Sequence, residues 1–366
     1  MLNGQIIMIN FQNILERDIT KNECLELFYD DEHIFEIMNI ANLLRKKIVG
    51  DIVTYIMNAN INYTNICNNK CKFCAFRKSK YDKNSYFMTP KEVGLKARKF
   101  QQLGATEFCI QGGVYEKVDT YYQVEILKSI KYYTSPYGKT TIHAFSPMDI
   151  KCGSENAGLD IKSALILLKE AGLNSMPGTA AEILVDNVRE ELCPEKIKTS
   201  EWENIIRIAH NIGIPTSSTI MYGHIESYED IVEHLFKIKN IQNDTKGFTE
   251  FILLPYLNEN TEFKKNKRIK MSASGVLDMK VTAISRILFK DVIKNIQVPW
   301  VKLGIKFSQV CLMCGANDYS GSMIEDDISK SAGANFGTFM TKEMYQEAIK
   351  SIGRIPKERN TFYEYI

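Results

Sequence analysis

The stretch Ile66-Cys67-Asn68-Asn69-Lys70-Cys71-Lys72-Phe73-Cys74-Ala75-Phe76 spaces three cysteines as C-x-x-x-C-x-x-C, directly after a strand-like run. Three thiolates on one short loop can hold three irons of a four-iron cluster and leave the fourth iron open. A structural zinc loop without its fourth ligand, or thiols that only pack in a core, are the alternatives. The loop holds no histidine that could complete a zinc site, so the spacing favours the cluster.

The spacing also resembles the signature of the radical S-adenosylmethionine (SAM) enzymes, and the aromatic Phe73 before the third cysteine fits the same pattern. The resemblance implies that Cys67, Cys71 and Cys74 ligate a 4Fe-4S cluster whose open iron chelates the amino and carboxylate groups of SAM. It further implies that an electron from the cluster splits SAM into methionine and a 5′-deoxyadenosyl radical. The expected cofactors are therefore the cluster and SAM.

Composition argues against several classes of protein. The chain has 366 residues, 45% of them hydrophobic, and a formal net charge of +2, so it offers no global field for nucleic acid or an anionic membrane. No apolar run reaches the roughly 18 residues that could span a bilayer, and residues 1–10 do not look like a signal peptide. Nine cysteines in so large a chain indicate a reducing compartment. We expect a soluble cytoplasmic protein without a nucleic-acid or membrane partner.

From residue 54 onward, short β-rich runs alternate with amphipathic helical stretches. Such alternation favours a parallel sheet, and eight units favour a closed α/β barrel of the (β/α)8 TIM type with right-handed crossovers. We expect residues 1–50 to form a helical N-terminal extension, residues 51–320 the barrel, and residues 321–366 a helical closure of its other end. The expected strands are 54–63, 106–111, 140–146, 173–176, 215–222, 248–254, 295–300 and 309–313.

Several helix starts are marked by side chains that can cap the first turn. The string Thr89-Pro90-Lys91-Glu92 offers a capping box with proline at the first helical position. The same pairing is offered by Thr20 with Glu23, Ser200 with Glu203, and Ser227 with Asp230.

Two other features of the sequence are interpreted as structural rather than functional. Cys311 and Cys314 lie in the run assigned to the eighth strand, where residues three apart point to opposite faces, so we expect core packing rather than a second cluster. A basic run follows the sixth strand, and a solvated loop is favoured there over a docking patch for an electron donor. Its members are Lys264, Lys265, Lys267, Arg268 and Lys270.

In a barrel of this type the reacting groups collect at the C-terminal ends of the strands. Gly112 and Gly113 follow the second strand, where bare backbone can approach a ligand, and the resemblance places the methionine amino group of SAM there. After the fourth strand, the Glu182 carboxylate suits the ribose hydroxyls or amino group of SAM, and the Arg189 guanidinium suits its carboxylate. Ordinary turns and surface charges remain the alternatives.

The fifth strand ends in Met221-Tyr222-Gly223-x-x-Glu226, which resembles the element that contacts adenine in radical SAM barrels. His224 in this element and His143 at the end of the third strand are candidates for proton transfer, with a packing histidine as the alternative. The catalytic residues are otherwise unassigned. Asn317 and Asp318 follow the expected eighth strand, and we place them on a turn at the barrel mouth.

Together these strings make the chain similar to the radical SAM enzymes of deazaflavin and menaquinone synthesis, from about residue 50 nearly to the C-terminus. Within that group it resembles the CofH-type subunit of 7,8-didemethyl-8-hydroxy-5-deazariboflavin synthase. The aminofutalosine synthase sibling tends to carry three glycines where this chain has Gly178-Thr179-Ala180-Ala181, and Asp318-Tyr319-Ser320-Gly321 departs from the family's leucine and two glycines. The strings that carry the resemblance are 110–113, 143–147, 175–182 and 315–318.

The resemblance implies transfer of a 4-hydroxybenzyl group from L-tyrosine to 5-amino-6-(D-ribitylamino)uracil. The radical would remove a hydrogen from tyrosine, the Cα–Cβ bond would break to leave 2-iminoacetate, and the fragment would add to C5 of the uracil. The implied partners are these two substrates, a low-potential ferredoxin or flavodoxin, and a companion radical SAM subunit that closes the deazaflavin ring. We expect a pocket for both substrates beside the SAM site, bounded near His143, His224 and Asn317.

Two alternative functions stay open at this point. An aminofutalosine-type enzyme would add the SAM-derived radical to an enolpyruvyl benzoate and keep the deoxyadenosyl group in its product. A non-catalytic iron–sulfur or zinc protein would act as a scaffold or sensor. Metal analysis and the fate of deoxyadenosine separate these possibilities.

Overall fold

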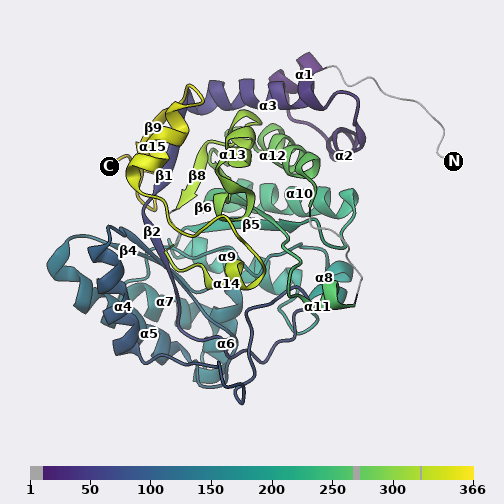
Figure 1. The fold of residues 1–366 in the computed structure, drawn as a ribbon. Helices are drawn as coiled ribbons and strands as arrows, with labels where there is room; N and C mark the ends of the chain where they lie inside the picture. Colours follow the sequence, from purple (N-terminus) through teal and green to yellow (C-terminus); the bar gives the residue numbers. More distant parts are fainter. Residues whose placement is uncertain (1–10, 267–272, 322–323) are drawn as a thin grey trace.

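The computed structural model describes residues 11–266, 273–321 and 324–366, with parallel strands at its centre and helices outside them (Figure 1). The strands are β1 (Ile52–Ile56), β2 (Asn58–Asn62), β3 (Glu107–Gln111), β4 (Thr141–Ala144), β5 (Thr216–Tyr222), β6 (Phe248–Pro255), β7 (Ile296–Gln297), β8 (Asp318–Gly321) and β9 (Ile355–Glu358). The helices are α1 (Phe11–Glu16), α2 (Lys21–Tyr29), α3 (Ile34–Val49), α4 (Pro90–Gln102), α5 (Thr120–Thr134), α6 (Pro147–Ala157), α7 (Ile161–Ala171), α8 (Asp186–Leu192), α9 (Thr199–Asn211), α10 (Tyr228–Thr245), α11 (Glu262–Lys265), α12 (Gly275–Phe289), α13 (Trp300–Met313), α14 (Asp327–Ser331) and α15 (Lys342–Lys350).

The strands form a ring that closes through one irregular segment. β1 pairs with β8 and continues after Met57 as β2, which pairs with β3, and β3 pairs with β4. Between β4 and β5 the expected fourth strand is reduced to two single pairings, Ser175 with His143 and Met176 with Thr216. β5, β6, β7 and β8 then follow in order. All these pairings are parallel, so the predicted (β/α)8 barrel is confirmed.

The expected strand at 309–313 is wrong, because those residues end helix α13. Cys311 and Leu312 are fully buried, whereas Val310 and Met313 are partly exposed, which is a helical pattern of burial. A short apolar run does not by itself distinguish a strand from a buried helix, and here it was assigned to the wrong one. The expectation of core packing still holds, since Cys311 and Cys314 are both buried free thiols.

The true eighth strand is β8, which begins at Asp318 and has little intrinsic strand propensity. It is ordered by tertiary contacts, among them the Thr54 hydroxyl, which donates to the Asp318 carboxylate at 2.6 Å. Asn317 therefore lies at the start of a strand and not at the barrel mouth. Its side-chain oxygen accepts from Arg286 at 2.7 Å and from the Ile296 amide at 2.9 Å, so it does not border the substrate pocket as expected.

The described segments before and after the barrel both pack against it. α2 and α3 lie against α10 and α12, and β9 pairs in parallel with the edge of β1 that β8 leaves free (Figure 1). The segment 321–366, expected to be a helical closure, contains α14 and α15 but also the strand β9, and its residues 322–323 lie outside the described residues. The domain limits at residues 50 and 320 stay predictions. In the part of the chain that is described, no helix has the length and apolarity to cross a membrane.

The caps explain where several helices begin. The boxes at Thr20, Thr89 and Ser227 are all formed. The box expected at Ser200 is wrong, because α9 begins at Thr199 and Glu201 instead accepts from the Lys198 amide at 2.9 Å. Of the basic run after β6, Lys264 and Lys265 lie in α11, while Lys267, Arg268 and Lys270 lie outside the described residues.

Candidate functional site

The cysteine loop leaves the C-terminal end of β2 and borders a cavity at the mouth of the barrel, which we call the upper cavity. The loop is fixed to the chain beyond it, because the Cys67 amide donates to the Lys78 carbonyl at 3.1 Å. The cavity also touches Gln111, Met221 and Leu254, which lie at the C-terminal ends of three strands. The predicted cluster loop lines it with Cys67, Cys71, Phe73 and Cys74.

The surroundings of the sulfurs suit metal-bound thiolates. The Val114 amide donates to Cys67 Sγ at 3.4 Å. Burial raises the pKa of Cys67 and of Cys71, while the nearby Lys196 cation acts in the opposite direction, and a bound metal deprotonates a coordinating thiol outright. Among the described residues, no three His, Cys, Asp or Glu side chains lie close enough to hold one metal ion. A four-iron cluster is larger than a single ion, so its ligands need not converge so closely.

Gly112 and Gly113 allow the loop after β3 to lie directly against the cysteine loop. A β-carbon on Gly113 would lie 2.1 Å from the Ile66 carbonyl oxygen, and one on Gly112 would lie 2.4 Å from the Tyr63 ring. No side chain fits at such distances. Both glycines line the upper cavity, so bare backbone borders the space beside the cysteines.

Glu182 and Lys196 form a largely buried ion pair in the wall of the upper cavity. Burial is the largest single influence and would raise the pKa of Glu182, but the charge and hydrogen bond of Lys196, together with the nearby Arg189 and His224, leave the pKa below its usual value. Burial is likewise the largest single influence on Lys196 and would lower its pKa, yet interaction with Glu182, together with Cys71 and Cys193, raises it. Lys196 Nζ also lies 5.1 Å from the centre of the Phe73 ring. A charged pair therefore stands beside the cysteine loop at neutral pH.

Arg189 does not line the upper cavity, which corrects the role expected for it. The side chain is only 3% exposed. Its guanidinium donates to the backbone carbonyls of Ala180, Ala181, Ile183 and Ile197. Arg189 therefore holds the loop that carries Glu182. The cations that line the cavity are Arg77, Lys196 and Lys302, and of these Lys196 is the one paired with Glu182.

The turn after β5 is held by its own side chains. Glu226 accepts from the amides of Gly223 and His224, and the His224 ring contacts the Met221 carbonyl at 3.0 Å. Gly223 has a φ of 83°, and a β-carbon there would lie 2.5 Å from that of Ala273. Of the expected adenine element, Met221 lines the upper cavity, whereas Gly223 and Glu226 shape the turn. His224 belongs to the turn and lines neither this cavity nor the one below it.

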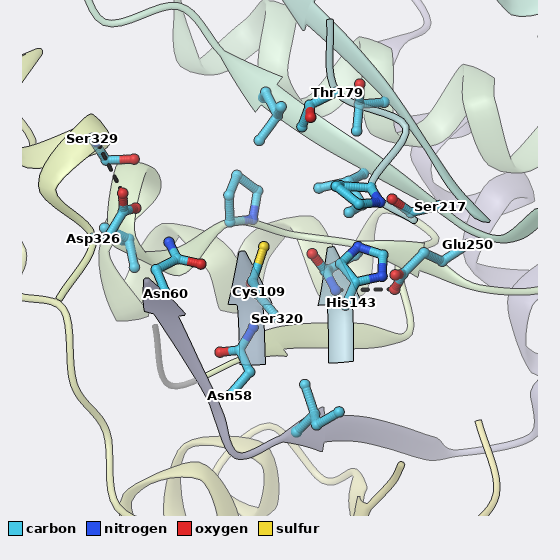
Figure 2. A pocket seen from close by; sticks show the side chains of 18 of the residues that line it. Asn58, Asn60, Cys109, His143, Thr179, Ser217, Glu250, Ser320, Asp326 and Ser329 are labelled. Atoms are coloured by element: carbon cyan, nitrogen blue, oxygen red, sulfur yellow. Dashed lines mark hydrogen bonds between the residues drawn. The ribbon is translucent and has the colours of Figure 1, made fainter. Parts of the chain in front are cut away.

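A second cavity of about 200 Å³, which we call the lumen, lies inside the ring of strands (Figure 2). It adjoins the upper cavity, because both are lined by Gln111, Thr179 and Leu254. Branched aliphatic side chains normally fill the interior of such a barrel. Here the inward positions are largely polar and include Asn58, Asn60, Glu107, His143, Ser217 and Glu250.

His143 is the candidate that the structure does bring to a cavity. It lines the lumen, and its Nδ1 lies 2.6 Å from the Ser175 hydroxyl. Burial lowers the pKa of His143, so the ring is neutral at physiological pH. A neutral imidazole offers one donor and one acceptor nitrogen, which suits a hydrogen-bonding wall as well as proton transfer.

The C-terminal tail closes the floor of the lumen. Arg359 directly follows β9, and its guanidinium donates to Asp318 at 2.5 Å and to Glu250 at 3.2 Å. Thr361 donates to Glu107 at 2.6 Å. Burial, together with repulsion from Asp318 and Glu107, raises the pKa of Glu250 to about 7 despite the adjacent guanidinium. Two buried carboxyls, those of Asp318 and Glu250, therefore share one cation at the floor, and the Glu107 carboxyl is bound there by Thr361.

Sequence reasoning missed four residues that the cavities bring forward: Lys196, Asn60, Glu250 and Arg359. One signal was available, because the string 58–62 alternates asparagine with an apolar residue, and a strand places such asparagines on one face. No comparable signal marks the other three. Lys196 lies in an irregular segment, and Glu250 and Arg359 meet only in the folded barrel.

Two family models match the chain. The model described as the radical SAM superfamily matches residues 61–238, and the model described as the CofH/MqnC C-terminal region matches residues 245–366. The first model covers the cysteine loop and most of the upper cavity wall, and the second covers the C-terminal strands and tail.

Curated relatives match over nearly their whole length. A protein of Methanococcus maripaludis (strain C7) is 54% identical over 98% of this chain and 100% of its own. One of Methanocaldococcus jannaschii is 56% identical over 96% of this chain and 98% of its own. Both are named 5-amino-6-(D-ribitylamino)uracil–L-tyrosine 4-hydroxyphenyl transferase.

Solved structures share the fold at low sequence identity. Methylornithine synthase (PylB) has a TM-score of 0.71 at 17% identity, covering 94% of this chain and 96% of its own. The FeFe-hydrogenase maturase HydG from Carboxydothermus hydrogenoformans has a TM-score of 0.70 at 16% identity, covering 96% and 79%. These likenesses support the arrangement of strands and helices.

Proposed function

The chain belongs to the radical SAM superfamily and, within it, to the family of the 5-amino-6-(D-ribitylamino)uracil–L-tyrosine 4-hydroxyphenyl transferases, and we propose that its two adjoining cavities hold the cofactors and the substrates of that transfer. It is an enzyme, and its reaction is a step of deazaflavin biosynthesis. The observation that carries the proposal for the site is the contact between a cysteine-lined upper cavity and a polar lumen.

The upper cavity is proposed as the cofactor site. Cys67, Cys71 and Cys74 would hold the 4Fe-4S cluster, with Phe73 packed beside them. When bound, the cluster and SAM supply a 5′-deoxyadenosyl radical by one-electron cleavage of SAM. This assignment is supported by the spacing of the cysteines, their common cavity and the amide that donates to Cys67.

Groups for binding SAM stand on the remaining walls of the upper cavity. Gly112 and Gly113 offer bare backbone to its methionine end, and Met221 offers an apolar contact to its adenine. Lys196 is the cation for the SAM carboxylate, and Glu182 is the acceptor for its amino or hydroxyl groups. Arg189 keeps an indirect role, because it holds the loop that carries Glu182.

The reaction consists of tyrosine cleavage followed by carbon–carbon bond formation. A hydrogen atom would pass from tyrosine to the 5′-deoxyadenosyl radical, and the Cα–Cβ bond would break to give 2-iminoacetate and a 4-hydroxybenzyl radical. This radical would add to C5 of the aminouracil, and the adduct would give up a proton and the one electron that was supplied for SAM cleavage. A primary-carbon radical attacks almost any C–H bond, so the protein must hold its substrates close and exclude water. The buried walls of both cavities and the tail that closes the floor serve this purpose.

Two protein partners complete the proposal. Cluster reduction calls for a low-potential ferredoxin or flavodoxin, and ring closure calls for a companion radical SAM subunit. We also place the enzyme in a reducing compartment, the cytoplasm, because all nine cysteines are free thiols.

Anaerobic turnover tests the proposed function. The protein is reconstituted with iron and sulfide, reduced with dithionite or flavodoxin, and supplied with SAM, tyrosine and the aminouracil. We expect free 5′-deoxyadenosine, 2-iminoacetate detected as glyoxylate, and a hydroxybenzylated uracil, with each product dependent on tyrosine. Turnover of an enolpyruvyl benzoate, with the deoxyadenosyl group retained in the product, would instead identify the aminofutalosine-type activity.

A further inference from the structure

The lumen changes character along its length. Its half near the floor is polar, whereas its half near the upper cavity carries more apolar groups. The polar half is lined by Asn58, Glu107, His143, Ser217, Glu250 and Gln297. The other half is mixed: Pro177, Leu254, Pro299, Val301 and Ile328 line it together with Gln111, Thr179, Lys302 and Ser329. A ligand that fills the lumen therefore needs many hydrogen-bonding groups at the floor end and can carry a flat group with fewer polar atoms at the other.

The side chain of Asn60 indicates that the lumen binds a ligand. Its side chain reaches into the lumen from β2, opposite Ser217 and Glu250 (Figure 2). The residue is 7% exposed, and its side-chain oxygen has no hydrogen-bond partner among the described residues. An unpartnered buried acceptor lowers stability, so proteins rarely keep one without a use. A ligand hydroxyl in the lumen would provide the missing donor.

The two substrates of the proposed function differ in what they require from such a cavity. A ribityl chain carries hydroxyls on successive carbons, and each is both donor and acceptor, so it needs mixed partners on several sides. The lumen supplies amides, a hydroxyl, an imidazole and a carboxyl from different strands. The tyrosine side chain carries a single hydroxyl on an aromatic ring, and needs apolar walls with one polar partner.

We propose that the lumen is the subsite for the ribityl chain of the acceptor, with Asn60 and Ser217 among its hydrogen-bonding partners and the uracil ring toward the upper cavity. The inference rests on the proposed function and adds the orientation of one substrate. The hydroxyl end of the chain lies toward the floor formed by Glu250 and Arg359. This orientation brings C5 of the uracil toward the boundary of the cavities, where the fragment from tyrosine must meet it.

The first test is Asn60→Leu, which keeps the branched shape of the side chain but replaces its unpartnered acceptor and its amide donor with bulkier methyl groups. The KM for the natural acceptor should rise about tenfold, as expected for loss of a buried hydrogen bond. For 5-amino-6-(pentylamino)uracil, which lacks the hydroxyls, the KM should change less than about twofold between variant and wild type. The melting temperature should not fall, because the acceptor has no partner in the free protein.

Neighbouring serines on β5 provide a matched pair. Ser217 lines the lumen, whereas Ser218 is also buried but does not, since successive strand residues face opposite ways. Each hydroxyl makes one internal hydrogen bond. The Ser217 hydroxyl accepts from the Gly178 amide at 3.0 Å, and the Ser218 hydroxyl donates to the Glu250 carbonyl at 2.8 Å. Ser217→Ala and Ser218→Ala should therefore lose similar stability, and only Ser217→Ala should raise the KM for the acceptor.

The outcomes separate this inference from the proposed function. A rise in the KM for tyrosine, with the acceptor KM unchanged, would assign the lumen to tyrosine and overturn the inference. An equal effect of Asn60→Leu on natural and pentyl acceptors would also overturn it. If wild type transfers nothing to the aminouracil, the proposed function fails, and equilibrium binding then decides the subsite. If the wild type binds the natural acceptor and Asn60→Leu weakens that binding about tenfold, the inference is supported. If the wild type does not bind the acceptor, or the variant binds it equally well, the inference is overturned.

Discussion

The two cavities are built in different ways. The upper cavity is formed by short loops that follow strands, so its cysteines, its glycine pair and its Glu182 each lie in a recognisable string. The lumen is formed by single inward-facing residues from successive strands, and its floor comes from the C-terminal tail. A local loop leaves a motif in the sequence, whereas a surface assembled from many strands leaves only isolated polar residues. Cofactor binding is therefore easier to infer from this sequence than substrate binding.

The largest expected effect is confined to the upper cavity. Replacing Cys67, Cys71 or Cys74 with alanine should abolish SAM cleavage, because each removes one ligand of the cluster. Iron content should fall in parallel, while the melting temperature of the metal-free protein should change little. Cys193→Ala is the control, since Cys193 is a buried free thiol that does not line the cavity, and this variant should keep its iron. Full cluster absorbance in a Cys71→Ala protein would refute the assignment.

Gly113→Ala should be the next most damaging change. Its β-carbon would lie 2.1 Å from the Ile66 carbonyl oxygen and 2.9 Å from Cys67 Cβ, so the two loops must separate. We expect incomplete cluster loading and at least about tenfold weaker SAM binding, measured by iron analysis and by equilibrium titration. Normal loading and SAM affinity would show that the close contact of the loops has no functional role.

Lys196→Met tests which cation serves the upper cavity. It leaves Glu182 buried without its partner and removes the only cation proposed for the SAM carboxylate, so the Kd for SAM should rise by at least about tenfold. Lys196→Arg keeps the charge and should restore much of the affinity. Arg189→Lys should act mainly on the melting temperature, because its contacts are backbone carbonyls. If Arg189→Lys weakened SAM binding and Lys196→Met did not, the SAM carboxylate would be assigned to Arg189.

The smallest expected effect is a pH dependence of stability that differs between Glu250 in the lumen and Glu182 in the upper cavity. The pKa of Glu250 is raised to about 7, so the stability it contributes is fully present below its ordinary value of 4.5 and is lost as pH rises toward 7. Glu250→Gln should therefore gain a few degrees of melting temperature relative to wild type between about pH 5 and pH 8. The pKa of Glu182 is lowered, so its contribution is present above 4.5 and lost only at lower pH. The melting temperature of Glu182→Gln should differ from that of wild type by a constant amount over the same pH range.

The same difference between local motifs and long-range contacts explains which strands were predicted from the sequence. The alternation of β-rich and helical stretches predicted the barrel and most of its strands, because each of those strands is a local apolar run. The eighth strand was missed because β8 is ordered by Thr54 and Arg359, two residues far away in the sequence. The apolar run before it was assigned to a strand, although its burial follows a helical pattern.

Within the upper cavity, residue type did not determine residue role. Arg189 is a buried cation and Lys196 a partly buried one, and both lie near Glu182. The sequence favoured the arginine because a guanidinium matches a carboxylate in shape. In the fold, the arginine is occupied by backbone carbonyls, and the lysine faces the cavity. His224 was similarly attractive as a proton carrier, yet its ring is used to hold the turn in which it lies. Such local engagements depend on backbone geometry that a motif does not specify.

The central claim is that the upper cavity holds the cofactors and the lumen holds the acceptor. An anaerobic crystal structure of the reconstituted enzyme with SAM and 5-amino-6-(D-ribitylamino)uracil tests it directly. We predict SAM beside Gly112, Gly113 and Lys196, and the ribityl chain in the lumen next to Asn60, with its last hydroxyl toward Glu250. A ribityl chain outside the lumen, or SAM bound away from the cysteine loop, would contradict the account.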